Sequence, residues 1–313
     1  MKASPNEILV QILRILQKAG FSVSQVDSED YCFEIVAKKD NVKLLIKTSE
    51  NIDNARKEPA EDLRSLAVAY SATPLIIGRM THNGTVEKDT LYERHGVNVI
   101  SPSTFKEIAL SGKLPFVYSK RGGLYFRING KYLRKLREER GMSLGDLAKR
   151  IGVSRKAIYD YETGSMGATF ETVAKIEETM DSAVTAGINV FDWHSGEDLP
   201  NRSPTGPVAR QLHGKLREMG CKTIGFTYAP VDVHARNMGI SFISNDKSHE
   251  EEALDRKVRT AVELGKLLQV ESVLVTGDHQ PRDLNITVIH MDDMKKLESI
   301  RDLEQLLNLK SSS

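Results

Sequence analysis

Cysteine, tryptophan and long apolar runs are scarce in this chain of 313 residues. The two cysteines, Cys32 and Cys221, stand far apart and form no CxxC pair, so we expect two buried thiols and neither a disulfide nor a metal site. The longest apolar stretch, residues 66–78, is interrupted by two hydroxyl residues and a proline. It therefore falls short of the roughly 18 apolar residues that a membrane-spanning helix needs.

The first ten residues, MKASPNEILV, contain no apolar core followed by a cleavage site. The sequence thus gives no sign of a secretion signal, and we expect a cytoplasmic protein with no membrane partner. Hydrophobic residues make up 40% of the chain and charged residues 28%. This is ordinary globular composition, and the length suggests two or three domains.

The small net charge of +1 hides a strong asymmetry along the chain. Residues 113–160 hold 13 Lys and Arg against 4 Asp and Glu, a net charge of +9, whereas residues 161–199 hold 1 against 8, a net charge of −7. A local basic cluster in an otherwise balanced protein favours an anionic partner for that segment, and nucleic acid is the first candidate. The alternative is a solvated basic face balanced by its acidic neighbour.

The pattern of apolar residues and turn signals predicts two α/β regions around a central helical one. The first region has helix patterns at 6–19, 58–70 and 103–111, and strand patterns at 21–26, 31–37, 42–47, 75–77 and 97–100. Residues 184–192 are ambiguous and fit one strand. We divide the chain into an α/β domain (1–114), a β-hairpin connector (115–129), a helix-turn-helix domain (130–182), a linker (183–207) and a second α/β domain (208–309).

The two α/β regions align as an internal repeat. Glu34 matches Asp232, and Lys47 falls at Asn245, each 13 residues after its acid. Residues 75–77 match 273–275, and residues 99–100 match 288–289. Few aligned residues are identical, so the hypothesis of duplication rests on the equal spacing of the matched segments. The alternative is two unrelated α/β domains whose helices and strands have similar lengths.

The clearest signal is the run from Leu133 to Met180, in which capping residues punctuate four short helices. Ser143 followed by Asp146 forms a capping box for the second helix. Gly152 can take the left-handed conformation that ends this helix. Ser154 and Thr169 are N-caps of the third and fourth helices. The positions expected to face the domain core are Leu133, Leu136, Leu144, Leu147, Ala148, Ile151, Val153, Ile158, Tyr161, Phe170, Val173, Ile176 and Met180.

This run resembles the helix-turn-helix of the Cro and lambda-repressor type. The resemblance implies that the third helix, residues 154–162, enters the major groove of DNA, with Arg155 able to pair with guanine and Lys156 with guanine or phosphate. The candidate DNA-binding residues within and beside the motif at 143–162 are Ser143, Ser154, Arg155, Lys156, Tyr159, Arg134 and Lys135. Arg134, Arg137 and Arg140 either grip the DNA backbone or are solvated. Leu144 stands where many members of this fold have a glutamine that contacts DNA. The base contacts known for those members therefore cannot be carried over in detail to this chain.

Residues 6–47 also resemble the frame of Holliday-junction resolvases and other restriction-endonuclease-like folds. Those enzymes carry an Asp and then Glu-x-Lys, whose two carboxylates hold a divalent metal. In this chain Glu34 replaces the Asp, Leu45 replaces the Glu, and Lys47 alone fits. The second copy keeps Asp232 but has Asn245 at the lysine position. We therefore expect no catalytic residues, no metal site, no cofactor and no enzymatic activity.

Taken as a whole, the chain resembles an archaeal family of helix-turn-helix transcriptional regulators. The stretches LLIKTSENID, TPLIIG, HGVNVIS and LREERGMSLGDLAKRIGVSRKAIYDYE carry this resemblance. It implies a sequence-specific regulator that binds double-stranded DNA, and we expect a homodimer because one recognition helix reads few base pairs. A metal-dependent nuclease and an RNA-associated or scaffold protein are the alternatives. The sequence specifies neither the operator, the sign of regulation nor an effector ligand.

Overall fold

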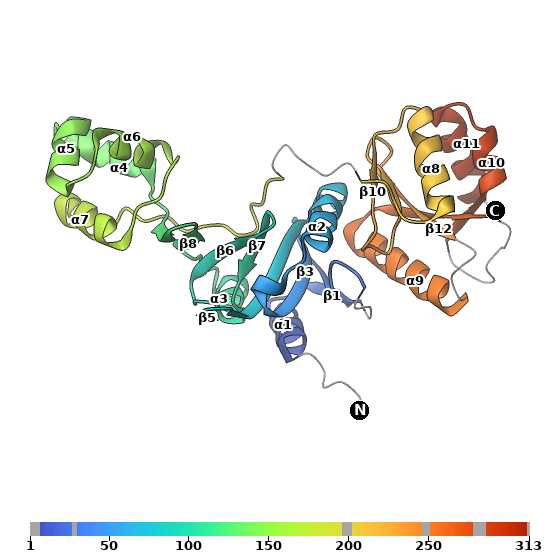
Figure 1. The fold of residues 1–313 in the computed structure, drawn as a ribbon, viewed down its shortest axis with the longest axis horizontal. Coiled ribbons are helices and arrows are strands. Elements are labelled where there is room, and N and C mark those ends of the chain that lie inside the picture. Colours follow the sequence, from blue (N-terminus) through green and yellow to red (C-terminus); the bar gives the residue numbers. More distant parts are fainter. Residues whose placement is uncertain (1–6, 27–29, 196–201, 246–250, 278–285, 312–313) are drawn as a thin grey trace.

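The computed structural model describes residues 7–26, 30–195, 202–245, 251–277 and 286–311, which form three bodies (Figure 1). An N-terminal and a C-terminal α/β domain pack against each other, and a small helical domain lies at the opposite end of the N-terminal domain. The fold class agrees with the sequence prediction of α/β domains around a central all-α helix-turn-helix domain. Residues 1–6 and 196–201, which the sequence analysis assigned to the first domain and the linker, lie outside the described part.

The N-terminal domain is a mixed sheet with helices on both faces. Its helices are α1 (Glu7–Lys18), the 3₁₀ helix η1 (Ile52–Asn54), α2 (Lys57–Tyr70) and α3 (Pro102–Ser111). Its strands are β1 (Ser22–Gln25), β2 (Ile35–Lys39), β3 (Val42–Asn51), β4 (Thr73–Thr81), β5 (Gly84–Thr85), β6 (Thr90–Arg94) and β7 (Val97–Ile100). Strands β3, β4 and β7 are parallel, whereas β1, β2 and β3 pair antiparallel. Helices α1 and α3 cover one face of the sheet and α2 covers the other.

The three α-helices of this domain were predicted to within two residues of their ends, whereas the short 3₁₀ helix η1 was missed. The strand expected at 31–37 is wrong over its first four residues, because regular pairing begins at Ile35 and the chain before it turns. Strands β5 and β6 were missed. Strand β6 (TLYER) gives a weak signal, since two of its five side chains are buried and the rest are partly or fully exposed.

The connector and the helical domain follow as predicted. Strands β8 (Val117–Lys120) and β9 (Gly123–Phe126) form the hairpin, and β8 pairs with β6, so the hairpin extends the sheet of the N-terminal domain. The helical domain consists of α4 (Gly130–Glu139), α5 (Leu144–Ile151), α6 (Arg155–Thr163) and α7 (Phe170–Met180). Its core is a separate cluster of apolar side chains.

The strand considered at residues 184–192 is wrong. The segment forms one isolated bridge, between Thr185 and Ile128, and otherwise runs extended against its neighbours. Val184, Ile188 and Val190 are nonetheless buried. Their apolar pattern reflects burial in two cores, because Val184 packs in the core of the helical domain and Val190 in that of the N-terminal domain. Backbone hydrogen bonds to the connector, such as Asn129 N to the Val184 carbonyl, hold the segment between them. The first half of the expected linker therefore packs against both domains.

In its described residues, the C-terminal domain repeats the main element order of the first, without counterparts of η1, β5 and β6 and with one additional helix at its end. Its helices are α8 (Pro207–Glu218), α9 (Glu251–Leu268), α10 (Met291–Lys296) and α11 (Ile300–Ser311). Its strands are β10 (Thr223–Gly225), β11 (Val233–Ala235), β12 (Ile240–Asn245), β13 (Glu271–Thr276) and β14 (Thr287–His290), in that order in the sheet. As in the first copy, two antiparallel pairs are followed by two parallel ones. No helix in the described part of the chain is long and apolar enough to span a membrane.

The topology supports the internal repeat and corrects one register. Residues 99–100 and 288–289 occupy matching places, because each lies opposite the central parallel strand of its sheet. Lys47 does not match Asn245, however. Ile35 pairs with Ile46, 11 residues later, whereas Val233 pairs with Phe242, 9 residues later. The tighter β11–β12 connection therefore places Ile243 at the Lys47 position.

The two α/β domains pack through equivalent helices, as Figure 1 shows for α2 and α9. Helix α9 lies against β1 and β2 of the first domain. From α2, the Asp62 carboxylate accepts hydrogen bonds from the backbone N–H groups of Thr227 and Tyr228, both at 2.7 Å. The Tyr70 hydroxyl donates to Ser241 Oγ at 2.7 Å. The duplicated halves therefore form a pseudo-symmetric pair within one chain, and the helical domain lies outside this pair.

Candidate DNA-binding surface

Helix α5 and the turn after it have the cap geometry predicted from the sequence. The Ser143 hydroxyl accepts a hydrogen bond from Asp146 N, and the Asp146 carboxylate accepts one from Ser143 N, which completes the capping box. This bonding holds the pKa of Asp146 below its usual value. Gly152 ends the helix with φ of 81°, a conformation that strains residues with a Cβ atom. The angle between α5 and α6 is thereby set by local chemistry.

Helix α6 presents one apolar and one polar face. Ile158 and Tyr161 are buried in the domain core. Arg155, Lys156 and Tyr159 lie on the opposite side and are exposed, with 56% of Tyr159 accessible. The structure thus brings the three predicted base-reading side chains onto one exposed helix face.

The two predicted N-cap serines differ in what they offer a ligand, because the Ser143 hydroxyl also interacts with the Asp146 carboxylate, whereas Ser154 has no acidic partner among the described residues. Ser154 Oγ accepts from Ala157 N at 3.0 Å, and Ser143 Oγ accepts from Asp146 N at 3.1 Å. A hydroxyl group that accepts in a cap can still donate its own proton. Each helix N-terminus also carries partial positive charge. Both ends are therefore suited to a phosphate oxygen.

Arg134 and Lys135 are exposed on α4, but each has an acidic partner one helical turn away. Arg134 Nε lies 2.9 Å from Glu138 Oε1, and Lys135 Nζ lies 3.7 Å from Glu139 Oε1. Pairs of this kind stabilise a helix by about 0.3–0.5 kcal/mol. They are weak enough to open when a phosphate approaches, so both side chains stay candidates for backbone contacts.

Arg137 has a structural role that the sequence analysis missed. Its guanidinium lies between helices, donating to both Glu162 carboxylate oxygens at 2.5 and 2.9 Å and to the Met142 carbonyl at 2.8 Å. The two paired side chains are 10% and 6% exposed. Hydrogen bonding to Glu162 raises the pKa of Arg137 above its usual value. Arg137 is therefore neither solvated nor placed to grip DNA, and the 25-residue separation from its partner leaves no local signal.

One further prediction in this domain is refined and one is wrong. Arg140 is exposed, as the solvated alternative predicts, and it also donates to the Met180 carbonyl at 2.6 Å, which ties α4 to the end of α7. Phe170 was expected in the core, but it is 67% exposed. As the first residue of α7 it lies at the edge of the domain, where its ring meets that of Phe126 at 6.0 Å.

The acids at the nuclease-like positions are held in ion pairs in both α/β domains. Glu34 accepts from the backbone N–H and hydroxyl of Thr48 and lies 3.1 Å from Lys47 Nζ. Asp232 accepts in the same way from Ser244 and lies 2.7 Å from Lys257 Nζ. The shared pattern is further support for the repeat.

These residues do not fit the divalent metal that the endonuclease frame implies. Leu45, at the position of the second carboxylate, is fully buried in the apolar core. The oxygens of Glu34 are already engaged by Lys47 and Thr48. Over the described residues, no group of three His, Cys, Asp or Glu side chains is arranged to hold a metal ion. We derive no chemical step from this site.

Comparison with known protein families agrees with both parts of this description. A helix-turn-helix family model matches residues 133–185, which include the N-caps Ser143, Ser154 and Thr169. A model described as a PD-(D/E)XK superfamily domain matches residues 5–115, which include Glu34 and Lys47. The central domain is thus a helix-turn-helix DNA-binding domain, and the first α/β domain has an endonuclease-type fold.

Full-length relatives extend the similarity over the whole chain. A protein of Thermococcus gammatolerans is 31% identical over 304 residues, which cover 97% of this chain and 95% of the relative. A protein of Methanocaldococcus jannaschii is 32% identical over 304 residues, covering 95% of each chain. Both carry the name "Putative HTH-type transcriptional regulatory protein". The similarity is therefore not confined to the central domain.

Proposed function

Because the chain belongs to this archaeal family of helix-turn-helix transcriptional regulatory proteins, we propose that it is a sequence-specific regulator whose helix α6 enters the major groove of DNA. The observation that carries the proposal is the amphipathic placement of α6. Its buried face anchors it to the domain, while Arg155, Lys156 and Tyr159 stand together on the exposed face. The N-terminal residues of such a helix meet base edges in this docking geometry.

Each candidate residue has a distinct role in the proposed complex. Arg155, in the first turn of α6, donates two hydrogen bonds to the O6 and N7 atoms of guanine. Lys156 reaches guanine or a neighbouring phosphate, and Tyr159 contacts the groove one turn further along. Ser154 donates to a phosphate at the N-terminus of α6, and Ser143 does so at the N-terminus of α5 after its hydroxyl turns away from Asp146. Arg134 and Lys135 contact the DNA backbone after releasing their glutamate partners.

The Arg155→Ala variant tests the reading of bases. It should lose about 1–3 kcal/mol of binding free energy on the operator and much less on random duplex, because discrimination resides in the base contact. The operator is first recovered by selecting bound duplexes from a random library, and both affinities are measured by fluorescence anisotropy. Lys135→Ala serves as the comparison, since loss of a phosphate contact weakens all sequences alike. Equal losses on both DNAs for Arg155→Ala would remove this residue from the base-reading set.

We also propose that the protein is not an enzyme and that its endonuclease-type domain has a structural role. The full-length protein should not cleave duplex, single-stranded or junction DNA when magnesium or manganese is added. The reason is that Leu45 supplies no carboxylate and Glu34 is held by Lys47 and Thr48. Electrophoresis of end-labelled DNA measures the outcome. Metal-dependent cleavage that disappears in the Lys47→Ala protein would contradict the proposal.

The proposed DNA-bound form is a homodimer. The chain has one helix-turn-helix domain between its two similar α/β domains, so their pairing within the chain supplies no second reading helix. Two chains should therefore occupy half-sites about 34 Å apart, one turn of DNA. Since α2 and α9 are used within the chain, the dimer contacts lie on other surfaces. Light scattering and footprinting should give a dimer on a two-fold site, and a monomer protecting one half-site would contradict this.

A further inference from the structure

The hairpin and the start of α4 carry unpaired positive charge. Between Glu107 and Glu138 the chain has no Asp or Glu, but it has eight Lys and Arg residues. Lys113 lies 3.5 Å from Asp89, and Arg134, Lys135 and Arg137 pair with glutamates. Among the described residues, the remaining four form no ion pair and are exposed: Lys120, Arg121, Arg127 and Lys131.

The hairpin register places two cations and two aromatic rings on one face of the ribbon. Tyr118 pairs with Tyr125, and their ring centroids are 6.0 Å apart. Alternation along the strands puts Lys120 and Arg127 on the same face as these rings. Neighbouring Arg121 stands at the tip, in the turn between β8 and β9. The exposed ribbon therefore offers several donors and no acidic side chain of its own.

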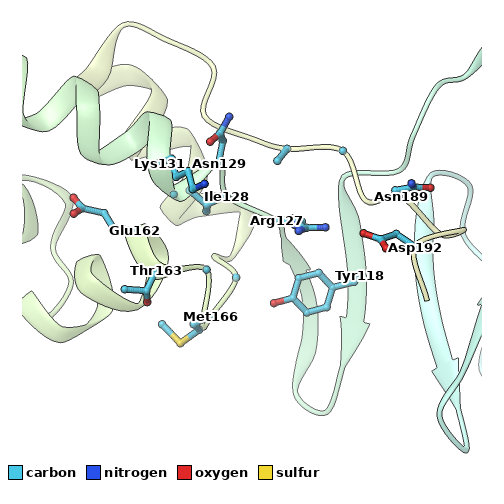
Figure 2. Close-up of a pocket in the computed structure, with 15 residues that line it drawn as sticks. Tyr118, Arg127, Ile128, Asn129, Lys131, Glu162, Thr163, Met166, Asn189 and Asp192 are labelled. Carbon is cyan, nitrogen blue, oxygen red and sulfur yellow. The ribbon is translucent and has the colours of Figure 1, made fainter. Parts of the chain in front are cut away.

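This face borders a cleft of about 670 Å³, which we call the hairpin cleft (Figure 2). One wall is the hairpin, with Tyr118 and Arg127, and the start of α4 adds Asn129 and Lys131. The other walls are the end of α6 with its following loop, and the segment that carries Asn189 and Asp192. Two acids also line the cleft. Glu162 is already neutralised by Arg137, and exposed Asp192 lies 3.7 Å from His194.

The hairpin cleft continues the recognition surface. Along α6 the exposed side chains run from Arg155 through Tyr159 to Thr163, and Thr163 itself lines the cleft. Met166, 41% exposed, follows in the loop. When the N-terminal end of such a helix meets base edges, its far end approaches the groove wall, which consists of sugar and phosphate. The cleft thus lies where a DNA backbone would pass.

Lys131 occupies a position that folding alone does not favour. It is the second residue of α4, where the helix dipole is positive and a cation is unfavourable. The first turn of α4 contains no acidic residue to compensate. A lysine at this place gains a favourable interaction only when an anion is present.

We propose that the hairpin cleft binds the sugar-phosphate backbone of the same duplex that α6 reads. Arg127 and Lys131 contact phosphates within the cleft, and Lys120 and Arg121 contact phosphates beyond it. These contacts position the protein without specifying sequence. The inference rests on the proposed function, because it assumes that α6 enters the major groove.

The test compares Arg127→Ala/Lys131→Ala with wild type on a long mixed-sequence duplex. Affinity is measured by anisotropy from about 50 to 200 mM salt, where each phosphate contact contributes about 0.9 to the slope of log affinity against log salt. The slope of the variant should be smaller than that of wild type by about 2 units, one for each phosphate contact removed. When the salt is raised over this range, the affinity of the variant should therefore fall by a factor about twelvefold smaller than the affinity of wild type. Its melting temperature should be unchanged or raised, because a cation leaves a helix N-terminus.

The matched control is Arg210→Ala/Lys222→Ala, which removes the same charge from exposed positions of the C-terminal domain and should leave the slope unchanged. An unchanged salt slope in the cleft variant would overturn the inference. A loss of affinity confined to single-stranded DNA or RNA would also overturn it. Neither result affects the Arg155→Ala experiment, which tests the proposed function separately. If wild type binds no duplex at all, the proposed function fails, and this inference fails with it. A folded cleft variant with a reduced slope on duplex DNA supports the inference.

Discussion

Glu162→Ala should unfold the helix-turn-helix domain and leave both α/β domains folded. The substitution removes both carboxylate hydrogen bonds of the Arg137 guanidinium, which is 10% exposed and keeps only the Met142 carbonyl and a longer, exposed contact of 3.6 Å with Glu138 Oε1. Breaking a buried ion pair from one side costs about 3–5 kcal/mol. A domain of this size has a total stability of about 3–8 kcal/mol. The expected loss is therefore comparable with the whole free energy of unfolding of this domain.

Calorimetry of the full-length variant should show a low-temperature transition that wild type lacks, and limited proteolysis should cut within residues 130–182. Two further variants separate burial from charge. Arg137→Met/Glu162→Leu should recover most of the stability, because replacing both partners with apolar groups removes the stranded charge. Lys135→Ala/Glu139→Ala deletes an exposed pair of the same helix and should change stability by less than about 0.5 kcal/mol. If Glu162→Ala melts like wild type, the pair does not stabilise the domain as the geometry indicates.

The contrast between these two ion pairs shows what the sequence can reveal. Lys135 and Glu139 are four residues apart, so helical periodicity alone brings them together. The helix caps at Ser143, Ser154 and Thr169 are also local, and each was predicted and then found. Arg137 and Glu162 meet through the tertiary crossing of α4 and α6, for which no spacing rule exists. The recognition face was therefore predictable, whereas the ion pair beneath it was not.

The same distinction applies to the α/β domains. Buried parallel strands such as β4 and β7 were recognised because they are rich in apolar residues: β4 contains the run Leu75–Ile77, and β7 is apolar at three of its four positions. The packing of α2 against the second domain could not be foreseen, since an amphipathic helix does not specify which sheet covers it. Asp62 illustrates the difficulty. On a predicted helix it resembles a surface acid, but it is buried and caps backbone N–H groups of the other domain, and burial raises its pKa.

The junction between the two α/β domains also contains a neutral histidine. His234 is 2% exposed, and its Nδ1 lies 2.9 Å from Ser241 Oγ. Ser241 accepts a hydrogen bond from the Tyr70 hydroxyl, so its own proton points to Nδ1 of His234. If Nδ1 were protonated, its N–H would face the Ser241 hydroxyl proton, and neither group could accept a hydrogen bond from the other. Burial, with a smaller contribution from Arg236, lowers the pKa of His234 from 6.5 to about 4.

Acid should therefore loosen the packing of the two α/β domains. The unfolded chain binds this proton more tightly than the folded one, so stability is unaffected above about pH 6.5 and declines as the pH falls towards 4. The full effect of this single group is about 3 kcal/mol. Two other groups titrate nearby. His213, whose pKa burial also lowers, adds a loss of the same sign, whereas Asp62, with its raised pKa, opposes it.

The His234→Asn variant isolates the contribution of this histidine, because the amide keeps an acceptor for Ser241 and carries no charge at any pH. Urea unfolding at neutral pH and at about pH 5 should show a smaller loss of stability in the variant than in wild type, with His213 and Asp62 contributing equally to both. At neutral pH the two proteins should differ little, since wild type is neutral there as well. An identical loss in both proteins would mean that His234 accepts its proton without disturbing the bond from Ser241, and that the junction is not sensitive to acid at this position.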